Sequence, residues 1–174
     1  MTLSFTSTAL PAFRAGLQHL DHFLDLAARH AQQRGFSPDA LVSLRLAPDM
    51  LGFASQVRIA CDTAKNATAR LAGLEAPRFS DDETTFEQLR ERIHKTLAWL
   101  DTVAADAFDS RLGADITFPV GREKTRTMIA QDYAQQHALP NFYFHVVTAY
   151  NLLRQAGVGL GKMDFLLGRD AVKA

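Results

Sequence analysis

The chain has 174 residues, 47% of them hydrophobic, which suffices for one domain with a sizeable core and is too short to expect two. Its 19 basic residues balance 19 acidic ones, and the densest basic cluster is the short segment 122–126. This composition excludes the strongly cationic surface that is typical of nucleic-acid-binding proteins. We therefore expect a single domain spanning residues 1–174, with no nucleic-acid partner.

The N-terminal residues and the single cysteine bear on location. The first residues lack a basic region followed by an apolar one, and no uncharged apolar run approaches the roughly 18 residues of a membrane span. One cysteine, Cys61, excludes an intramolecular disulfide and fits a reducing compartment. These features predict a cytoplasmic protein that does not enter the membrane.

The first half of the chain predicts two long helices. Apolar residues recur at spacings of three and four from about Ala9 to Gln33, and Gly35 ends this helix. Pro11 is expected in its first turn or at a kink, because proline removes a hydrogen bond further inside. A second helix is predicted to start at Pro48-Asp49 and to stop at Gly73, with an alanine-rich inner face that permits close packing.

A linker, a third helix and a hairpin follow. Residues 74–80 are predicted as a linker, after which capping residues begin a helix that runs to about Asp101. β-branched residues flank Gly121 in segment 115–129, which predicts a small hairpin whose first strand Pro119 restricts to a sheet edge.

The last helix is predicted from about Ala130 to Ala156, with Pro140 kinking or dividing it. Four amphipathic helices joined by modest connections indicate an all-α four-helix bundle, with the hairpin between the third and fourth helices.

Three polar residues of the last helix, His137, Asn141 and His145, are four residues apart and should share one face. Two histidines one turn apart can bind a metal, but an asparagine amide is a far poorer ligand for zinc or nickel. His137 and His145 lie about 12 Å apart in a straight helix, so a joint site would need the kink at Pro140. A hydrogen-bonded core position for His145 is the favoured interpretation.

Three segments carry a resemblance to a known family: 45–50 (RLAPDM), 56–62 (QVRIACD) and 138–150 (ALPNFYFHVVTAY). Over nearly its whole length the chain resembles a bacterial family known only as a domain of unknown function. That family looks like a branch of the DinB/YfiT-like superfamily, four-helix bundles regarded as metalloenzymes, some of which use small thiols as co-substrates. The resemblance implies the same bundle here.

The superfamily's metal site consists of three histidines, one from the second helix and two spaced by four in the last helix. Counting back from Gly157, His145 matches the second of the latter two positions and Asn141 the first. The predicted second helix contains no histidine, and its nearest equivalents are Gln56 or Arg58. The resemblance therefore implies a degenerate metal site. No cofactor is expected, and zinc, nickel or iron at His137 and His145 is the minor alternative.

Polar residues of the second helix accompany a stripe that should otherwise be buried. Charged groups inside a bundle need partners, so either Asp62 pairs with Arg58, or both face His145 and Tyr143 across a polar pocket. Solvation of Arg58 and Asp62 is the equally weighted alternative. The candidate ligand-binding residues are Gln56, Arg58, Asp62, Asn141, Tyr143 and His145.

Other chemically active side chains have simpler interpretations. His19 and His22 are expected as an exposed pair beside Asp21 and Asp25, and Cys61 as a packed core residue. His30 and His94 are expected at the surface.

The aromatic residues of the last helix, at positions 142–144 and 150, cover more than one face. Either a second chain or the hairpin and residues 163–167 should bury them. We predict a small-ligand- or partner-binding module that forms a homodimer. The alternative is a metal- or thiol-dependent transferase or hydrolase that uses His145 as a ligand or general base.

Overall fold

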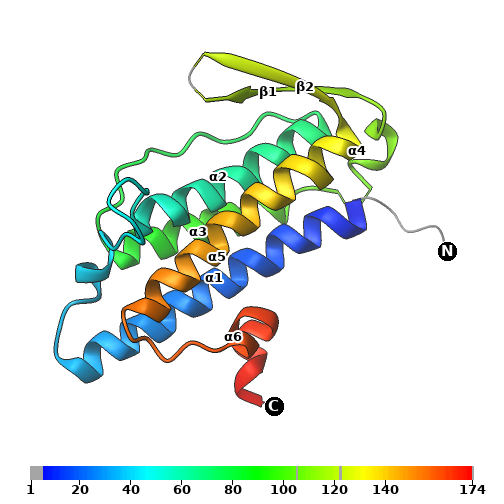
Figure 1. Ribbon diagram of the computed structural model, residues 1–174. Helices are drawn as coiled ribbons and strands as arrows, with labels where there is room; N and C mark the ends of the chain where they lie inside the picture. The colour runs from blue at the N-terminus through cyan, green and yellow to red at the C-terminus, as the bar shows by residue number, and fades with distance from the viewer. Residues whose placement is uncertain (1–5, 105, 122, 174) are drawn as a thin grey trace.

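The computed structural model describes residues 6–104, 106–121 and 123–173. Within these residues, four long helices form a bundle, and an antiparallel hairpin lies beside one end of it (Figure 1). The predicted all-α four-helix bundle with a hairpin between the third and fourth helices is confirmed. The long helices are α1 (Thr6–Arg34), α2 (Phe53–Ala72), α3 (Phe86–Leu100) and α5 (Leu139–Gln155). The shorter elements are β1 (Asp115–Val120), β2 (Lys124–Ile129), α4 (Ala130–Asp132) and α6 (Lys162–Leu167).

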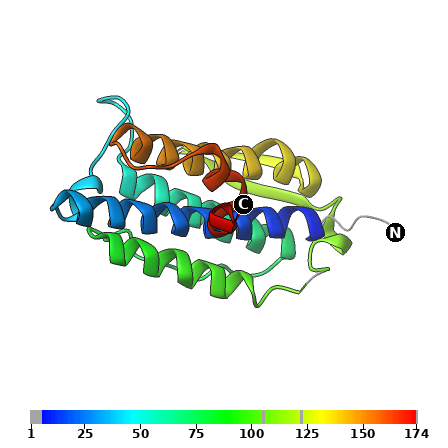
Figure 2. The ribbon, with the colours of Figure 1, turned by 90° about the horizontal axis from the view of Figure 1, so that it is seen from below.

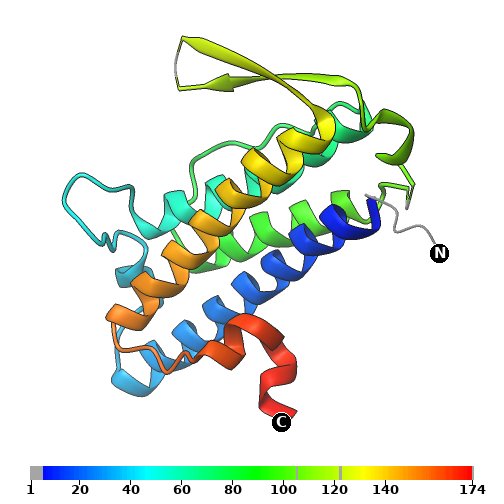
Figure 3. The ribbon, with the colours of Figure 1, turned by 45° about the vertical axis from the view of Figure 1, so that its right-hand side comes forward.

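The helix α1 lies between α3 and α5, and α2 closes the ring behind it (Figure 2). α1 runs antiparallel to α3, because Arg14 near its start donates to the carbonyl of Leu100 at the end of α3. It runs parallel to α5, since Phe13 packs edge-on against Phe142. α2 runs antiparallel to α5, since His145 bonds Gln56 near the start of α2 and Asn141 bonds Thr63 further along it. α2 and α3 therefore point the same way, and residues 73–85 return along the length of the bundle to connect them (Figure 3).

The close contact of α1 with α5 depends on a glycine. A Cβ on Gly16 would lie 2.4 Å from Cε1 of Phe142, closer than side-chain atoms approach. Pro11 lies inside α1 beyond its first described turn, so the first-turn alternative is wrong and the kink stays a prediction.

The helix α2 begins at Phe53, after the N-cap Gly52, and the predicted start at Pro48-Asp49 is wrong. Those residues form a turn instead, in which the Met50 amide donates to the Ala47 carbonyl at 3.0 Å. The predicted end is confirmed, because Gly73 caps α2 in the left-handed conformation at φ 69°.

The start of α3 is a capping box. The Thr85 hydroxyl accepts from the Gln88 amide at 3.2 Å, and the Gln88 side chain accepts from the Thr85 amide at 3.1 Å. These reciprocal bonds satisfy two backbone donors that a helix N-terminus leaves free.

The last helix is divided, as Pro140 predicted. A π-helical segment, Tyr133–Ala138, separates α4 from α5, and Pro140 lies in the first turn of α5. Proline cannot donate to the carbonyl four residues earlier, and the Leu139 amide bonds the Ala134 carbonyl five residues back. The wider turn changes the direction in which the side chains of residues 130–138 project relative to those of α5.

Buried apolar side chains from all four long helices form one core, which the hairpin extends with Ile116 and Phe118. The two strands pair with Phe118 opposite Arg126 and Ile116 opposite Met128. Among the described residues, no helix combines the length and apolar character that crossing a membrane requires.

Candidate functional site

His145 and Gln56 form the centre of the predicted pocket. Nδ1 of His145 lies 2.7 Å from Oε1 of Gln56, and Nε2 of Gln56 donates to the Leu51 carbonyl at 2.9 Å. Because the Gln56 amide nitrogen is used by Leu51, its oxygen must accept, so His145 donates from Nδ1. Burial lowers the pKa of His145 to about 4. The imidazole is therefore neutral at pH 7, with its lone pair on Nε2.

The other two residues of the four-residue series have different partners. Nδ2 of Asn141 donates to the Thr63 hydroxyl on α2 at 2.9 Å. His137 packs against Phe118 of β1, with ring centroids 4.4 Å apart, and against Tyr133 at 5.7 Å. The three side chains do not converge, because the π-helical segment interrupts the 3.6-residue periodicity on which the prediction depended.

The residues at the superfamily's metal positions do not fit a three-histidine site. His145 is the one histidine among them, Gln56 stands at the α2 position, and the amide of Asn141 is bonded to Thr63. Within residues 6–104, 106–121 and 123–173, no group of three or more His, Cys, Asp and Glu side chains is placed to hold a metal. Gln56 and Asn141 instead connect α2 to α5 by hydrogen bonds.

The remaining candidate residues face other parts of the bundle. The Tyr143 hydroxyl points towards α1, 3.4 Å from the Ala12 carbonyl. Arg58 and Asp62 do not pair with each other among the described contacts: Arg58 donates to the Asp81 carbonyl, and Asp62 binds Arg92 and Lys65. The six candidates thus lie in three places, and their role in ligand binding stays a prediction.

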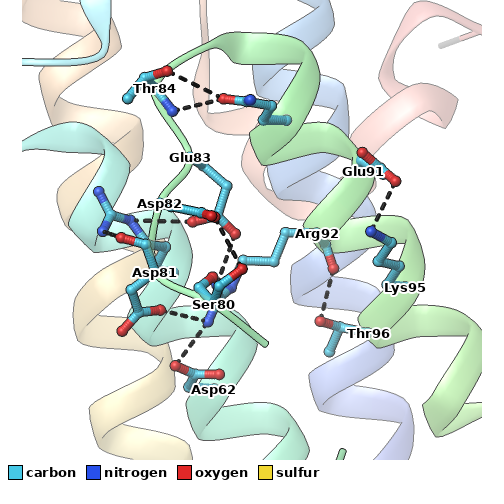
Figure 4. A network of polar contacts seen from close by, with 12 residues as sticks. Asp62, Ser80, Asp81, Asp82, Glu83, Thr84, Glu91, Arg92, Lys95 and Thr96 are labelled. Carbon is cyan, nitrogen blue, oxygen red and sulfur yellow. Dashed lines mark hydrogen bonds and ion pairs between the residues drawn. The ribbon is translucent and has the colours of Figure 1, made fainter. Parts of the chain in front are cut away.

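Arg92 of α3 lies at the centre of a polar cluster that was not among the candidate sites (Figure 4). It is 2% exposed, and its guanidinium lies 2.9 Å from Asp62, 3.0 Å from Asp81 and 2.7 Å from Glu83. A fourth contact is a hydrogen bond to the Ser80 carbonyl at 2.8 Å. Arg92 therefore attaches the long α2–α3 connection to both helices.

Charge is balanced within this Arg92 cluster. The cations Arg58, Lys65 and Arg92 face three carboxylates, and Lys65 also lies 4.2 Å above the ring of Phe79. Burial disfavours the charged guanidinium, but the hydrogen bond to Glu83 and the neighbouring carboxylates outweigh it and raise the pKa of Arg92. These ion pairs connect α2, α3 and the segment between them, although Nε of Arg92 and Oε2 of Glu83 have no hydrogen-bond partner among the described residues. The cluster therefore has a structural role.

Cys61 is a free cysteine buried in the core beside this cluster, as predicted. Burial raises the pKa of its thiol to about 12. A thiol that stays protonated is a poor nucleophile, so Cys61 contributes packing.

His22 is not the exposed histidine that was predicted. It is 1% exposed and lies 3.0 Å from a carboxylate oxygen of Asp164 in α6. The interpretation of His19 and His22 as an exposed pair is therefore wrong for His22, because α6 folds back over this face of α1. His94 is exposed, as expected, and lies 3.1 Å from Asp21.

We call α6 and the turns after it, residues 162–173, the C-terminal strap. Arg169 of this strap lies 2.8 Å from Asp21 and 2.6 Å from Asp25, and Arg90 binds the same two carboxylates. Between the strap, α1 and α3 there is a cavity of about 320 Å³. Its lining includes His19, Asp21, His94, Leu167 and Arg169.

The sequence pattern could have predicted that Arg92 is buried, but it could not have predicted the contact between His22 and Asp164 of the strap. Arg92 and Thr96 fall at helical spacing between Leu89, Ile93 and Leu100, so they lie on the buried face of α3. Asp164 is 142 residues from His22, and no local pattern links the two.

An apolar surface remains on α5 and α6. Phe144 is 56% exposed and Val147 is 39% exposed, three residues apart on the outer side of α5. A groove of about 270 Å³ continues from Val147 past Tyr150 to Phe165. Met163, next to Lys162 in α6, is 50% exposed. We call Phe144, Val147, Tyr150, Met163 and Phe165 the α5–α6 surface. Phe142, by contrast, is buried, and Phe165 packs edge-on against Tyr150, which agrees with one of the two predicted alternatives, cover by residues 163–167.

Comparisons with known proteins agree with the fold and the resemblance. The sequence profile of a domain of unknown function, DUF1993, matches residues 5–166. A crystal structure of a DinB family member protein from Shewanella denitrificans is similar, with 36% sequence identity and a TM-score of 0.85, over 92% of this chain and 90% of that chain. No curated protein matches the chain at a significant level. The chain therefore belongs to the DUF1993 family, within the DinB-like superfamily of helical bundles.

Proposed function

We propose that this protein is a partner-binding module in which the metal site of the superfamily has degenerated, and that its partner is a second copy of the same chain. The observation that carries the proposal is the α5–α6 surface. Phe144 and Val147 present apolar side chains outward from the middle of the helix, where one face of a bundle helix is ordinarily polar.

A second copy suits this surface because the part that α5 contributes is uncharged, while Lys162 of α6 lines the edge of the groove. Residues 138–153 contain no Asp, Glu, Lys or Arg, and His145 is neutral at pH 7. A two-fold interface places each patch against itself, which like charges would oppose. The 17 residues of α5 extend about 25 Å, and α6 adds surface beside them, which is compatible with an interface of about 1,200–2,000 Å².

The degenerate metal position supports binding over catalysis. Gln56, Asn141 and His145 are engaged in hydrogen bonds between α2 and α5, or from Gln56 to Leu51. Such bonds stabilise the bundle by about 1 kcal/mol each. The polar residues at the centre of the bundle therefore hold α5 in place, and α5 presents the outward stripe.

The test is the molar mass of the protein in solution, measured by light scattering during gel filtration and by sedimentation equilibrium. We expect a dimer at about 10 μM, and a monomer for Phe144→Glu, because the new carboxylates would meet across the two-fold axis. The matched control is Leu74→Glu, which changes a comparably exposed leucine outside the surface. A wild-type monomer up to about 100 μM, or a dimer unaffected by Phe144→Glu, would overturn the proposal.

The second candidate is a metal- or thiol-dependent transferase or hydrolase that uses His145. The observation in its favour is the tautomer: Gln56 accepts from Nδ1 of His145, which leaves Nε2 unprotonated. Elemental analysis by plasma mass spectrometry on the untagged protein and on His145→Ala separates the two candidates. Near-stoichiometric zinc, nickel or iron that disappears in the variant would favour the enzyme. The cytoplasmic location stays a prediction.

A further inference from the structure

The face of the hairpin that turns towards the bundle carries an unusual set of side chains. Phe118 of β1 is buried on this face, with its ring 4.7 Å from Tyr133 and 4.4 Å from His137. Arg126 of β2 is directly opposite Phe118 in the antiparallel pair. Directly opposite residues project from the same side of a sheet, so Arg126 projects beside the His137 ring.

A second arginine approaches the same place from α2. Nη1 of Arg70, in the last turn of α2, donates to the Tyr133 hydroxyl at 3.0 Å. Arg70 and Arg126 both lower the pKa of His137 by charge repulsion, after burial, which is the largest cause. The two guanidinium groups and the imidazole therefore lie close enough to interact.

The positive charge of this corner is not balanced by carboxylates. Within the part of the chain that the structure describes, no ion pair involves Arg70 or Arg126. By contrast, Arg58 pairs with one carboxylate, and Arg90, Arg92 and Arg169 each pair with two or more. Lys124, opposite Val120, projects from the same face of the hairpin as Arg126 and adds a further cation. Asp115 projects from the opposite face, because it lies an odd number of positions from Ile116 and Phe118 and side chains alternate along a strand.

We propose that this corner, formed by Arg70, Arg126, His137 and the Tyr133 hydroxyl, binds a small oxyanion bearing a phosphate or carboxylate group. Planar guanidinium groups match the oxygen geometry of both anions. Arg126 is exposed and His137 is half-buried, so solvent reaches the corner from the hairpin side. The proposal is independent of the dimer, since its residues lie on α2, β2 and the π-helical segment.

The experiment is a titration of the His137 ring followed by NMR on the intact protein, with and without inorganic phosphate, and with malonate as the carboxylate probe. An anion bound beside the ring stabilises the imidazolium, so we expect the pKa of His137 to rise by about one unit at saturation. We also expect the melting temperature to rise by about 3 °C. The probe that acts at lower concentration identifies the group.

Two variants keep the interpretation sharp. Arg126→Gln changes an exposed side chain, so the fold should be retained. Without anion, the variant should have a higher His137 pKa than the wild type, because one repelling charge is removed. Its affinity for the anion should fall at least about tenfold. Arg34→Gln removes an exposed arginine at the end of α1 and should leave both unchanged. Chloride at equal ionic strength reproducing the full effect, or an unchanged response in Arg126→Gln, would overturn the proposal.

Discussion

At the scale of single residues, His145 connects α5 to α2 by a buried hydrogen bond. Its Nδ1 donates to Gln56, and burial keeps the ring neutral by lowering its pKa to about 4. In the unfolded chain the same ring has its ordinary pKa of 6.5. At pH values between these two pKa values the unfolded state binds one proton more than the folded state. The free energy of unfolding therefore increases as pH rises through this range and decreases as pH falls.

We predict that acidification from pH 6.5 to pH 4 destabilises the protein through His145 by up to about 3 kcal/mol. His145→Gln can still bond Gln56 but does not titrate, so its stability should change less over the same interval. Urea unfolding of both proteins at a series of pH values measures the difference. Carboxylates titrate in both proteins, so their effect cancels in the comparison. Parallel pH profiles for the two proteins would contradict the attribution of the destabilisation to His145.

Arg92 gives a second prediction at this scale. Arg92→Met leaves Asp62, Asp81 and Glu83 without their shared cation, and breaking such a buried pair costs about 3–5 kcal/mol. Chemical denaturation measures the loss. Lys95→Met, which breaks an exposed pair with Glu91 on the same helix, should change stability by less than about 0.5 kcal/mol. Equal effects for the two variants would show that the Arg92 cluster is not a tie.

At the scale of elements, Gly16 sets the spacing of α1 and α5. Alanine normally favours a helix over glycine by up to about 1 kcal/mol, but here the new Cβ would lie 2.4 Å from the buried ring of Phe142. We predict that Gly16→Ala destabilises the protein by about 1–3 kcal/mol.

Thermal unfolding of a double-mutant cycle tests this contact. In a Phe142→Leu background the smaller side chain leaves room for the Cβ, so Gly16→Ala should cost less there or become stabilising. Gly113→Ala, where a Cβ would meet nothing within 4 Å, is the control and should be nearly neutral. Additive effects of the two substitutions would contradict the proposed clash.

Local patterns predicted the elements well because amphipathic spacing and capping chemistry act over a few residues. The hairpin, the end of α2 at Gly73 and the division at Pro140 follow from such signals. The start of α2 was predicted wrongly, because proline followed by an acidic residue is common both in turns and at helix N-termini, and here Pro48-Asp49 forms a turn. The helix starts only after the N-cap Gly52, where the Phe53 amide donates to the Leu44 carbonyl at 2.9 Å.

The candidate site was less predictable for two physical reasons. His137 was predicted to share a face with Asn141 because the two are four residues apart, but the π-helical segment changes that helical phase. Pro140 indicates that the helix is interrupted, but not in which way. His22 was placed at the surface from its polar neighbours, and a contact with Asp164 that depends on the whole fold buries it. Sequence spacing therefore identified Gln56 and His145 as candidates, but it did not establish that they would bond each other.

At the scale of the whole molecule, the C-terminal strap is held to the bundle by few contacts of different kinds. His22 binds Asp164, Arg169 bridges Asp21 and Asp25, and Phe165 stacks on Phe23. Hydrogen bonds from His22 and from the Gly161 amide lower the pKa of Asp164 against the opposing effect of burial. The stability that Asp164 contributes is thus present at neutral pH and lost as pH falls through its lowered pKa.

We predict that Arg169→Gln loosens the strap while the bundle stays folded, because Arg90 still pairs with Asp21 and Asp25. Hydrogen exchange read by mass spectrometry should show protection falling about tenfold or more in residues 162–167, with little change in α2 and α5. Lys162→Gln removes an exposed cation from the same segment and should leave exchange unchanged. Since α6 contributes Met163 and Phe165 to the α5–α6 surface, the variant should also weaken dimerisation. A uniform loss of protection across the bundle would contradict the prediction, because the strap would then unfold only together with the whole domain.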